Sequence, residues 1–91
     1  MIQVTNIGTN PNTYRSAAML NCWREYHGIV GGVECCVLDC HAWAKDGAHV
    51  TIGRGTKVYI VPMCHKHNCQ FGKTLWVREK DANPVRLTSL R

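Results

Sequence analysis

The sequence predicts a small α+β domain in which an N-terminal helix precedes a β-hairpin and a second, short helix. Three observations predict this class. Apolar residues recur at helical spacing in residues 14–27, two β-prone runs flank a glycine turn in residues 49–61, and cysteines and histidines cluster on both sides of those runs. With 91 residues and no long linker, the chain 1–91 is expected to form a single domain.

The first helix is expected to run from about residue 14 to residue 27. Asn12 or Thr13 can cap its start, and Gly28 stands where helices commonly end. A short strand is expected before it, at residues 2–4. The apolar side chains that should face a core are Met19, Cys22, Trp23 and Tyr26.

The hairpin is predicted from two β-prone runs on either side of "GRGT". The runs cover residues 49–52 and 57–61, and Pro62 is expected to end the second one. The segment "MCHKHNCQFG" then indicates a short helix closed by Gly72, and "KTLWVRE" one more strand. The tail "KDANPVRLTSLR" has isolated apolar residues among polar ones, so we expect a loosely packed extension.

Composition narrows the environment in which the chain works. It has no apolar run long enough to cross a membrane, and its N-terminus lacks the features of a secretory signal. We therefore expect a cytoplasmic protein with no membrane partner, in which the six cysteines stay reduced and serve as metal ligands or core residues. The net charge of +5 is compatible with a polyanionic partner such as DNA or RNA, and equally with an ordinary basic surface.

Two close pairs of cysteine and histidine predict a structural Zn²⁺ site. Zinc in such sites takes four ligands, usually as two pairs separated by a structured insert. Cys64 and His67 are three residues apart at the start of the second predicted helix, so their side chains share one face. The other pair lies in "CCVLDC", where either Cys35 or Cys36 joins Cys40. The predicted hairpin is the insert between the pairs.

Other reactive side chains nearby are not expected to bind the zinc ion, and His65 is expected at the surface. His65 adjoins Cys64 and His41 adjoins a second ligand cysteine, and such neighbours would strain a shared tetrahedron. Cys69 lies off the ligand face of the short helix and is expected to pack against the core, as is Cys22. Three aromatic side chains could stack on nucleic-acid bases, but core burial is expected for each: Trp43, Tyr59 and Trp76.

A cysteine knuckle (the pair in "CCVLDC"), then the hairpin and then the short helix follow one another in an order that resembles a treble-clef zinc finger. More narrowly, "GAHV" followed by "VYIVPMCHKHN" is similar to the ββα core of HNH-type nucleases. It is also similar to small bacterial and phage proteins of unknown role with the pattern CxxxxC…GAHV…IPLCxxHN. The resemblance covers about residues 35–72 and implies a treble-clef-like zinc-binding domain. It favours Cys35 over Cys36, which gives the ligand set Cys35, Cys40, Cys64 and His67.

The same resemblance implies where catalytic residues would lie. In an HNH site, a histidine on the first strand activates water, and residues on the helix help to hold a second divalent cation. His49 matches the histidine and Asn68 matches the helix position. Ala48, which precedes His49, has no ligand atom and departs from the pattern. The nearest carboxylate is Asp46, in what reads as a turn.

Three functions are consistent with these features. The favoured one is a non-catalytic zinc module that binds nucleic acid or a nucleic-acid-associated protein. The alternatives are an HNH-like metal-dependent endonuclease with His49 as general base, and a phage- or plasmid-type adaptor or inhibitor of a host protein. In the favoured case, phosphate contacts are expected from Arg54, Lys57, Lys66, Lys73, Arg78 and Lys80.

Overall fold

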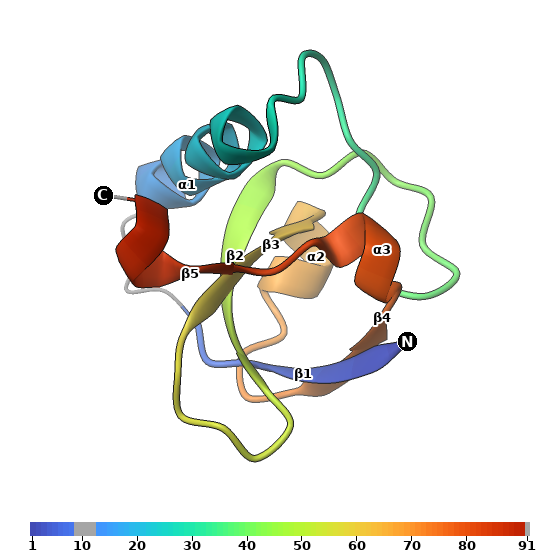
Figure 1. Cartoon of the computed structure of the whole chain (residues 1–91). Helices are drawn as coiled ribbons and strands as arrows, with labels where there is room; N and C mark the ends of the chain where they lie inside the picture. Colours follow the sequence, from blue (N-terminus) through green and yellow to red (C-terminus); the bar gives the residue numbers. More distant parts are fainter. Residues whose placement is uncertain (9–12, 91) are drawn as a thin grey trace.

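Five antiparallel strands form one sheet in the computed structural model, which describes residues 1–8 and 13–90 (Figure 1). Their order across the sheet is β4–β1–β2–β3–β5. The central hairpin is β2–β3, and the N-terminal strand lies between β2 and β4. Together with the helices described below, this sheet confirms the predicted α+β class. The strands are β1 (Ile2–Asn6), β2 (Asp46–Ile52), β3 (Tyr59–Met63), β4 (Thr74–Val77) and β5 (Val85–Arg86).

Two hydrophobic clusters cover opposite faces of this sheet. Successive side chains of a strand point to opposite faces, and His49 pairs with Ile60 while Ala48 pairs with Val61. Ile60 belongs to the cluster under helix α1 (Thr13–His27), together with Trp23. Ala48 and Val61 belong to the other cluster, which contains the buried cysteines Cys35, Cys36 and Cys64. We call the two sides the α1 face and the cysteine face.

Helix α1 lies directly on β2 because Gly47 has no side chain. A Cβ atom at Gly47 would be 2.6 Å from the backbone nitrogen of Leu20. The helix ends at the expected position, before Gly28 with φ 66°. Of the two expected caps, Asn12 lies outside the described residues and Thr13 is the first residue of the helix. No helix in the described part of the chain, α1 included, has the length and apolar composition needed to cross a membrane.

The expected inward-facing side of α1 is partly wrong. Trp23 is buried, but Tyr26 is 59% exposed. The helix presents Leu20 and Trp23 to the sheet, and Tyr26 follows Trp23 by three residues on the rim of that contact. Tyr26 instead packs its ring edge-on against His27, with ring centroids 5.3 Å apart.

The hairpin is longer than expected, and Pro62 does not end its second strand. β2 starts at Asp46 and β3 continues to Met63, so Pro62 lies inside a strand opposite Gly47. The carbonyl of Pro62 points away from β2 and accepts a hydrogen bond from Cys36 N–H (3.0 Å). The missing N–H of Pro62 therefore faces away from β2, and β5 pairs only with Tyr59 and Ile60. No ladder hydrogen bond is lost.

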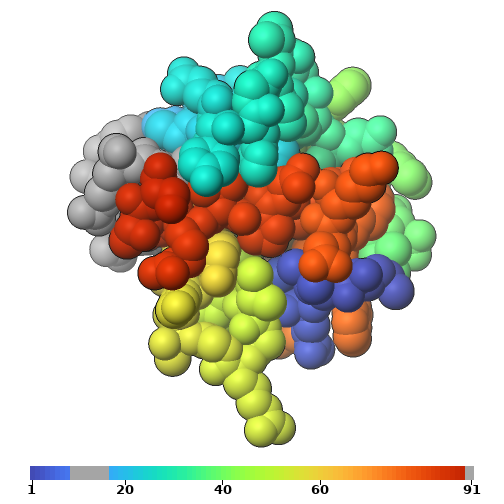
Figure 2. Space-filling view, in the orientation of Figure 1, coloured from blue at the N-terminus to red at the C-terminus, as the bar shows by residue number. Residues whose placement is uncertain are grey.

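The C-terminal segment is folded, so the expected loosely packed extension is wrong. Helix α3 (Glu79–Ala82), β5 and the 3₁₀ helix η1 (Leu87–Leu90) follow β4. The segment lies across the front of the molecule, between α1 and the β2–β3 hairpin (Figure 2). Ala82 and Val85 are buried, and Trp23 Nε1 donates a hydrogen bond to the carbonyl of Asn83 (2.9 Å). Isolated apolar residues in a polar tail are sufficient here because Ala82, Val85 and Leu87 each join an existing cluster.

Candidate metal centre

Four side chains from two distant parts of the chain meet on the cysteine face. The Sγ atoms of Cys35, Cys40 and Cys64 and a ring nitrogen of His67 all lie within 4.8 Å of one another. Cys40 Sγ is 4.0 Å from Cys64 Sγ, and His67 Nδ1 is 3.2 Å from Cys64 Sγ and 3.7 Å from Cys35 Sγ. Zinc–sulfur bonds of ~2.3 Å in a tetrahedron separate ligand atoms by roughly 3.5–3.8 Å. These spacings fit one metal ion.

The first pair is positioned by a tight turn. Cys40 N–H donates to the carbonyl of Val37 (3.0 Å), and Cys35 N–H donates to the carbonyl of Ala42 (2.8 Å). Asp39 takes the left-handed conformation in this turn, with φ 64°. The turn folds residues 35–40 into a knuckle, so that two thiols separated by four residues point to the same place.

The second pair lies at the start of α2 (His65–Asn68). Cys64 precedes the helix as its N-cap residue, and His67 follows three residues later, so both side chains lie on one side. The buried side chain of Asn6 holds the other end of this helix. Its Nδ2 donates to the carbonyls of His67 (3.3 Å) and Asn68 (2.8 Å). Sequence reasoning missed Asn6, because nothing in "VTNIG" indicates which helix end it will reach.

Cys35 and Cys36 are both buried, but only Cys35 belongs to the four-residue cluster. Cys36 lies in the hydrophobic core of the cysteine face. Its carbonyl accepts a hydrogen bond from Arg78 N–H (2.9 Å), which fixes its backbone. Burial raises the pKa of the Cys36 thiol, so it packs as a neutral side chain.

The shifted pKa values of Cys35, Cys40 and His67 are compatible with binding of a metal cation. Burial raises the pKa of Cys35 to about 12. Burial also acts to raise the pKa of Cys40, but hydrogen bonds, the largest from Ala42 N–H, outweigh it and lower that pKa. Burial first, and the charge of Lys66 second, lower the pKa of His67 and favour the neutral imidazole that binds metals. A divalent cation would let the buried thiols ionise together, because it removes the cost of an unpaired buried charge.

Arg78 fastens the knuckle to the C-terminal segment. Its guanidinium donates to the carbonyls of Cys35 (2.5 Å) and Cys40 (3.3 Å). Its Nε donates to Asp81 Oδ2 (2.5 Å), which keeps the guanidinium in place. The sequence suggested Arg78 as a phosphate contact, but its charge is engaged in holding the first pair of candidate ligands.

Asp46 forms the centre of a polar network beside the metal cluster. It is buried, and its Oδ2 accepts a hydrogen bond from Asn68 Nδ2 (3.0 Å) and lies 3.1 Å from His65 Nδ1. His65 Nε2 in turn lies 3.4 Å from Cys69 Sγ. The expected turn at Asp46 is therefore wrong, since the residue begins β2 and anchors α2 to it.

The structure does not bring His49 and Asn68 together. His49 points to the α1 face with its partner Ile60, and burial lowers its pKa. Asn68 is bonded to Asp46 on the cysteine face. Asp46 and His49 are three residues apart in one strand, an odd spacing that places their side chains on opposite faces. Ala48, between them, is fully buried among the residues of the cysteine face.

Several side chains expected in the core are on the surface. Cys69 is exposed, at the C-cap position that follows the end of α2 at Asn68. Trp43 is 65% exposed and Trp76 is 52% exposed. Trp76 lies in the edge strand β4 on the side opposite to its buried neighbour Val77.

Comparison of the chain with protein-family models, with curated proteins and with solved structures gives no match. The function is therefore inferred from the geometry of the site and from the surface around it.

Proposed function

We propose that this chain is a structural-zinc module that binds nucleic acid and does not cleave it. The observation that carries the proposal is the convergence of Cys35, Cys40, Cys64 and His67 on one point. Three thiols and one imidazole form a donor set that favours zinc over harder cations such as Mg²⁺. The ion would link the knuckle to α2, two segments that are far apart in the sequence.

The order of elements around the cluster supports a treble-clef-like arrangement. The knuckle of residues 35–40 comes first, the hairpin β2–β3 follows, and α2 starts at the second ligand pair. This is the order in which the zinc fingers that the sequence resembles arrange their ligands.

The positive charge of the chain supports a nucleic-acid partner. The separation of the candidate catalytic residues His49 and Asn68 supports the absence of cleavage. The net charge of +5 supplies the cations that contact phosphates. His49 and Asn68 face opposite sides of the sheet, so they share no groove in which water and a phosphate could be held between them.

The proposal is tested with fluorescently labelled DNA and RNA in a salt titration. We expect binding at low salt that weakens steeply as salt is raised, because phosphate contacts release counterions. A zinc-stripped sample serves as the control that shows whether binding requires the zinc-bound, folded protein. The absence of any affinity for DNA or RNA at low salt would contradict the proposal. A host protein recovered in stoichiometric amount instead would favour the adaptor alternative.

The nuclease alternative is tested on the same protein with supercoiled plasmid and Mg²⁺, Mn²⁺ or Ni²⁺. We expect no nicking above the level of a protein-free control. Cleavage that disappears in His49→Ala would show that the chain is an HNH-like enzyme after all, with His49 in the role that the resemblance gives it.

A further inference from the structure

The charged side chains of this molecule are segregated along the chain. Between residues 42 and 77 the only carboxylate is Asp46, which is buried and bonded to Asn68 and His65. The same stretch carries five exposed basic residues, Lys45, Arg54, Lys57, Lys66 and Lys73. The exposed carboxylates lie outside it, in α1, in the loop before β2 and in α3: Glu25, Glu34, Asp39, Glu79 and Asp81.

Three of these lysines surround α2. Lys45 N–H donates to the carbonyl of Met63 (3.1 Å), which places Lys45 at the start of the helix. Lys66 is exposed within the helix. Lys73 follows its end, where the carbonyl of Lys73 accepts a hydrogen bond from Asn6 N–H (2.9 Å). None of the three forms an ion pair with a described residue, so their charges face solvent.

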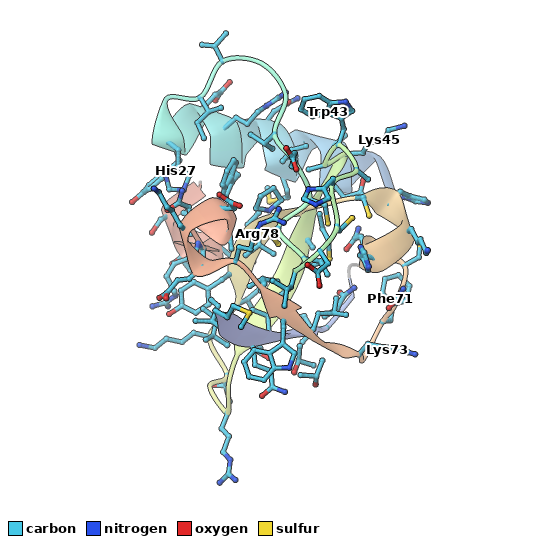
Figure 3. All side chains as sticks on the ribbon, turned by 90° about the vertical axis from the view of Figure 1, so that its right-hand side faces the viewer. His27, Trp43, Lys45, Phe71, Lys73 and Arg78 are labelled. Carbon is cyan, nitrogen blue, oxygen red and sulfur yellow. The ribbon has the colours of Figure 1, made fainter. Side chains whose placement is uncertain are left out.

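Two exposed aromatic rings extend this basic area. Trp43 is 65% exposed and Phe71 is 59% exposed. Figure 3 shows Trp43, Lys45, Phe71 and Lys73 along one side of the molecule with α2 between them, and the acidic helix α3 on the other side. Each ring lies beside a glycine, Trp43 beside Gly32 and Phe71 beside Gly8. We call Trp43, Lys45, Lys66, Phe71 and Lys73 the lysine–aromatic face.

We propose that the lysine–aromatic face binds single-stranded nucleic acid, with bases stacked on Trp43 and Phe71 and phosphates placed against the lysines. This inference rests on the proposed function and specifies its surface and its ligand. Stacking on an exposed ring requires a base whose own face is free, which an unpaired strand offers and an intact duplex does not. An acidic protein partner would use the lysines but would gain less from the two exposed rings.

The test measures binding of a fluorescent oligothymidylate and of a mixed-sequence duplex at low salt. Trp43→Ala and Phe71→Ala should each weaken single-strand binding by about 5-fold or more, which corresponds to the loss of one stacked base. Duplex binding should change little. Trp76→Ala is the matched control, because Trp76 is similarly exposed but lies in β4 on the opposite side of the sheet from α2. Zinc content and near-ultraviolet circular dichroism check that each variant is folded.

A second pair of variants tests the charges. Lys45→Gln and Lys66→Gln should each lower the salt dependence of single-strand binding, by about 0.7 in the slope of log K against log salt. Lys80 is one of the phosphate contacts expected from the sequence, but it lies in α3 between Glu79 and Asp81 and outside the lysine–aromatic face. Lys80→Gln is therefore the control and should leave the slope unchanged. If wild type binds but the Trp43, Phe71 and lysine variants bind as well as the controls, the surface assignment is wrong and the proposed function stands. If wild type binds neither strand form, both fail together.

Discussion

Cys35 and Cys36 are adjacent, equally buried and chemically identical, and yet only one of them belongs to the metal cluster. The difference comes from the backbone. The backbone N–H of Arg78 donates to the carbonyl of Cys36, and its guanidinium donates to the carbonyl of Cys35. With the backbone held in this way, the Cys35 thiol lies in the metal cluster and the Cys36 thiol in the hydrophobic core. Direction, rather than residue type, decides which cysteine can bind.

This pair allows a sharp test of the ligand set. Cys35→Ser should reduce bound zinc strongly, because it removes one of four ligands. Cys36→Ser should keep full zinc content, even if the buried hydroxyl lowers stability by about 1–3 kcal/mol. Zinc per chain is measured by elemental analysis of both purified variants. Equal zinc loss in the two variants would contradict the assignment of Cys35.

At the residue scale, the sequence predicts ligand spacing well and supporting contacts poorly. Cys64 and His67 could be paired because helical periodicity alone puts them together. Arg78 and Asn6 could not be assigned, since both act on backbone carbonyls of distant segments. The sequence predicts a buried Cys69 because it predicts a helix that reaches Gly72, whereas α2 ends at Asn68.

At the scale of elements, α1 lies so close to β2 at Gly47 that a Cβ atom there would be 2.6 Å from the backbone nitrogen of Leu20. Gly47→Ala should destabilise the protein by about 1–3 kcal/mol, because the new Cβ meets the backbone of Leu20, which no side-chain rotation can relieve. Gly32→Ala is the matched control. Its Cβ would meet only the exposed ring of Trp43, at 3.2 Å, which can move aside. Urea unfolding of both variants measures the difference, and equal stability losses would refute the close packing of α1.

The elements expected from local patterns are largely present. The errors arise where the extent of an element depends on which strand it pairs with. The helix of residues 14–27 and the hairpin have strong periodic or turn signals. The continuation of β3 through Pro62 depends on which side of the strand stays unpaired, which a proline alone does not tell. The order of the tail depends on Val85 finding Ile60 as its strand partner. Such long-range partners are not visible in a local window of sequence.

At the scale of the whole molecule, the cluster joins parts that the sheet alone does not. It ties the knuckle to α2 across the cysteine face, in a chain short enough to have a modest apolar core. Zinc binding in small domains contributes on the order of 10 kcal/mol to folding, comparable to the whole stability of a typical domain, about 5–15 kcal/mol. A structural zinc ion would therefore decide whether this chain is folded.

The most direct test is the zinc content of the purified chain, read together with near-ultraviolet circular dichroism before and after a strong chelator. We predict one zinc ion per chain, and loss of the tryptophan signal when the chelator removes it. Buried Trp23 is a suitable reporter because it lies on α1 and connects that helix to the sheet and to the C-terminal segment. Protein purified without zinc, with a spectrum that the chelator leaves unchanged, would contradict the central claim.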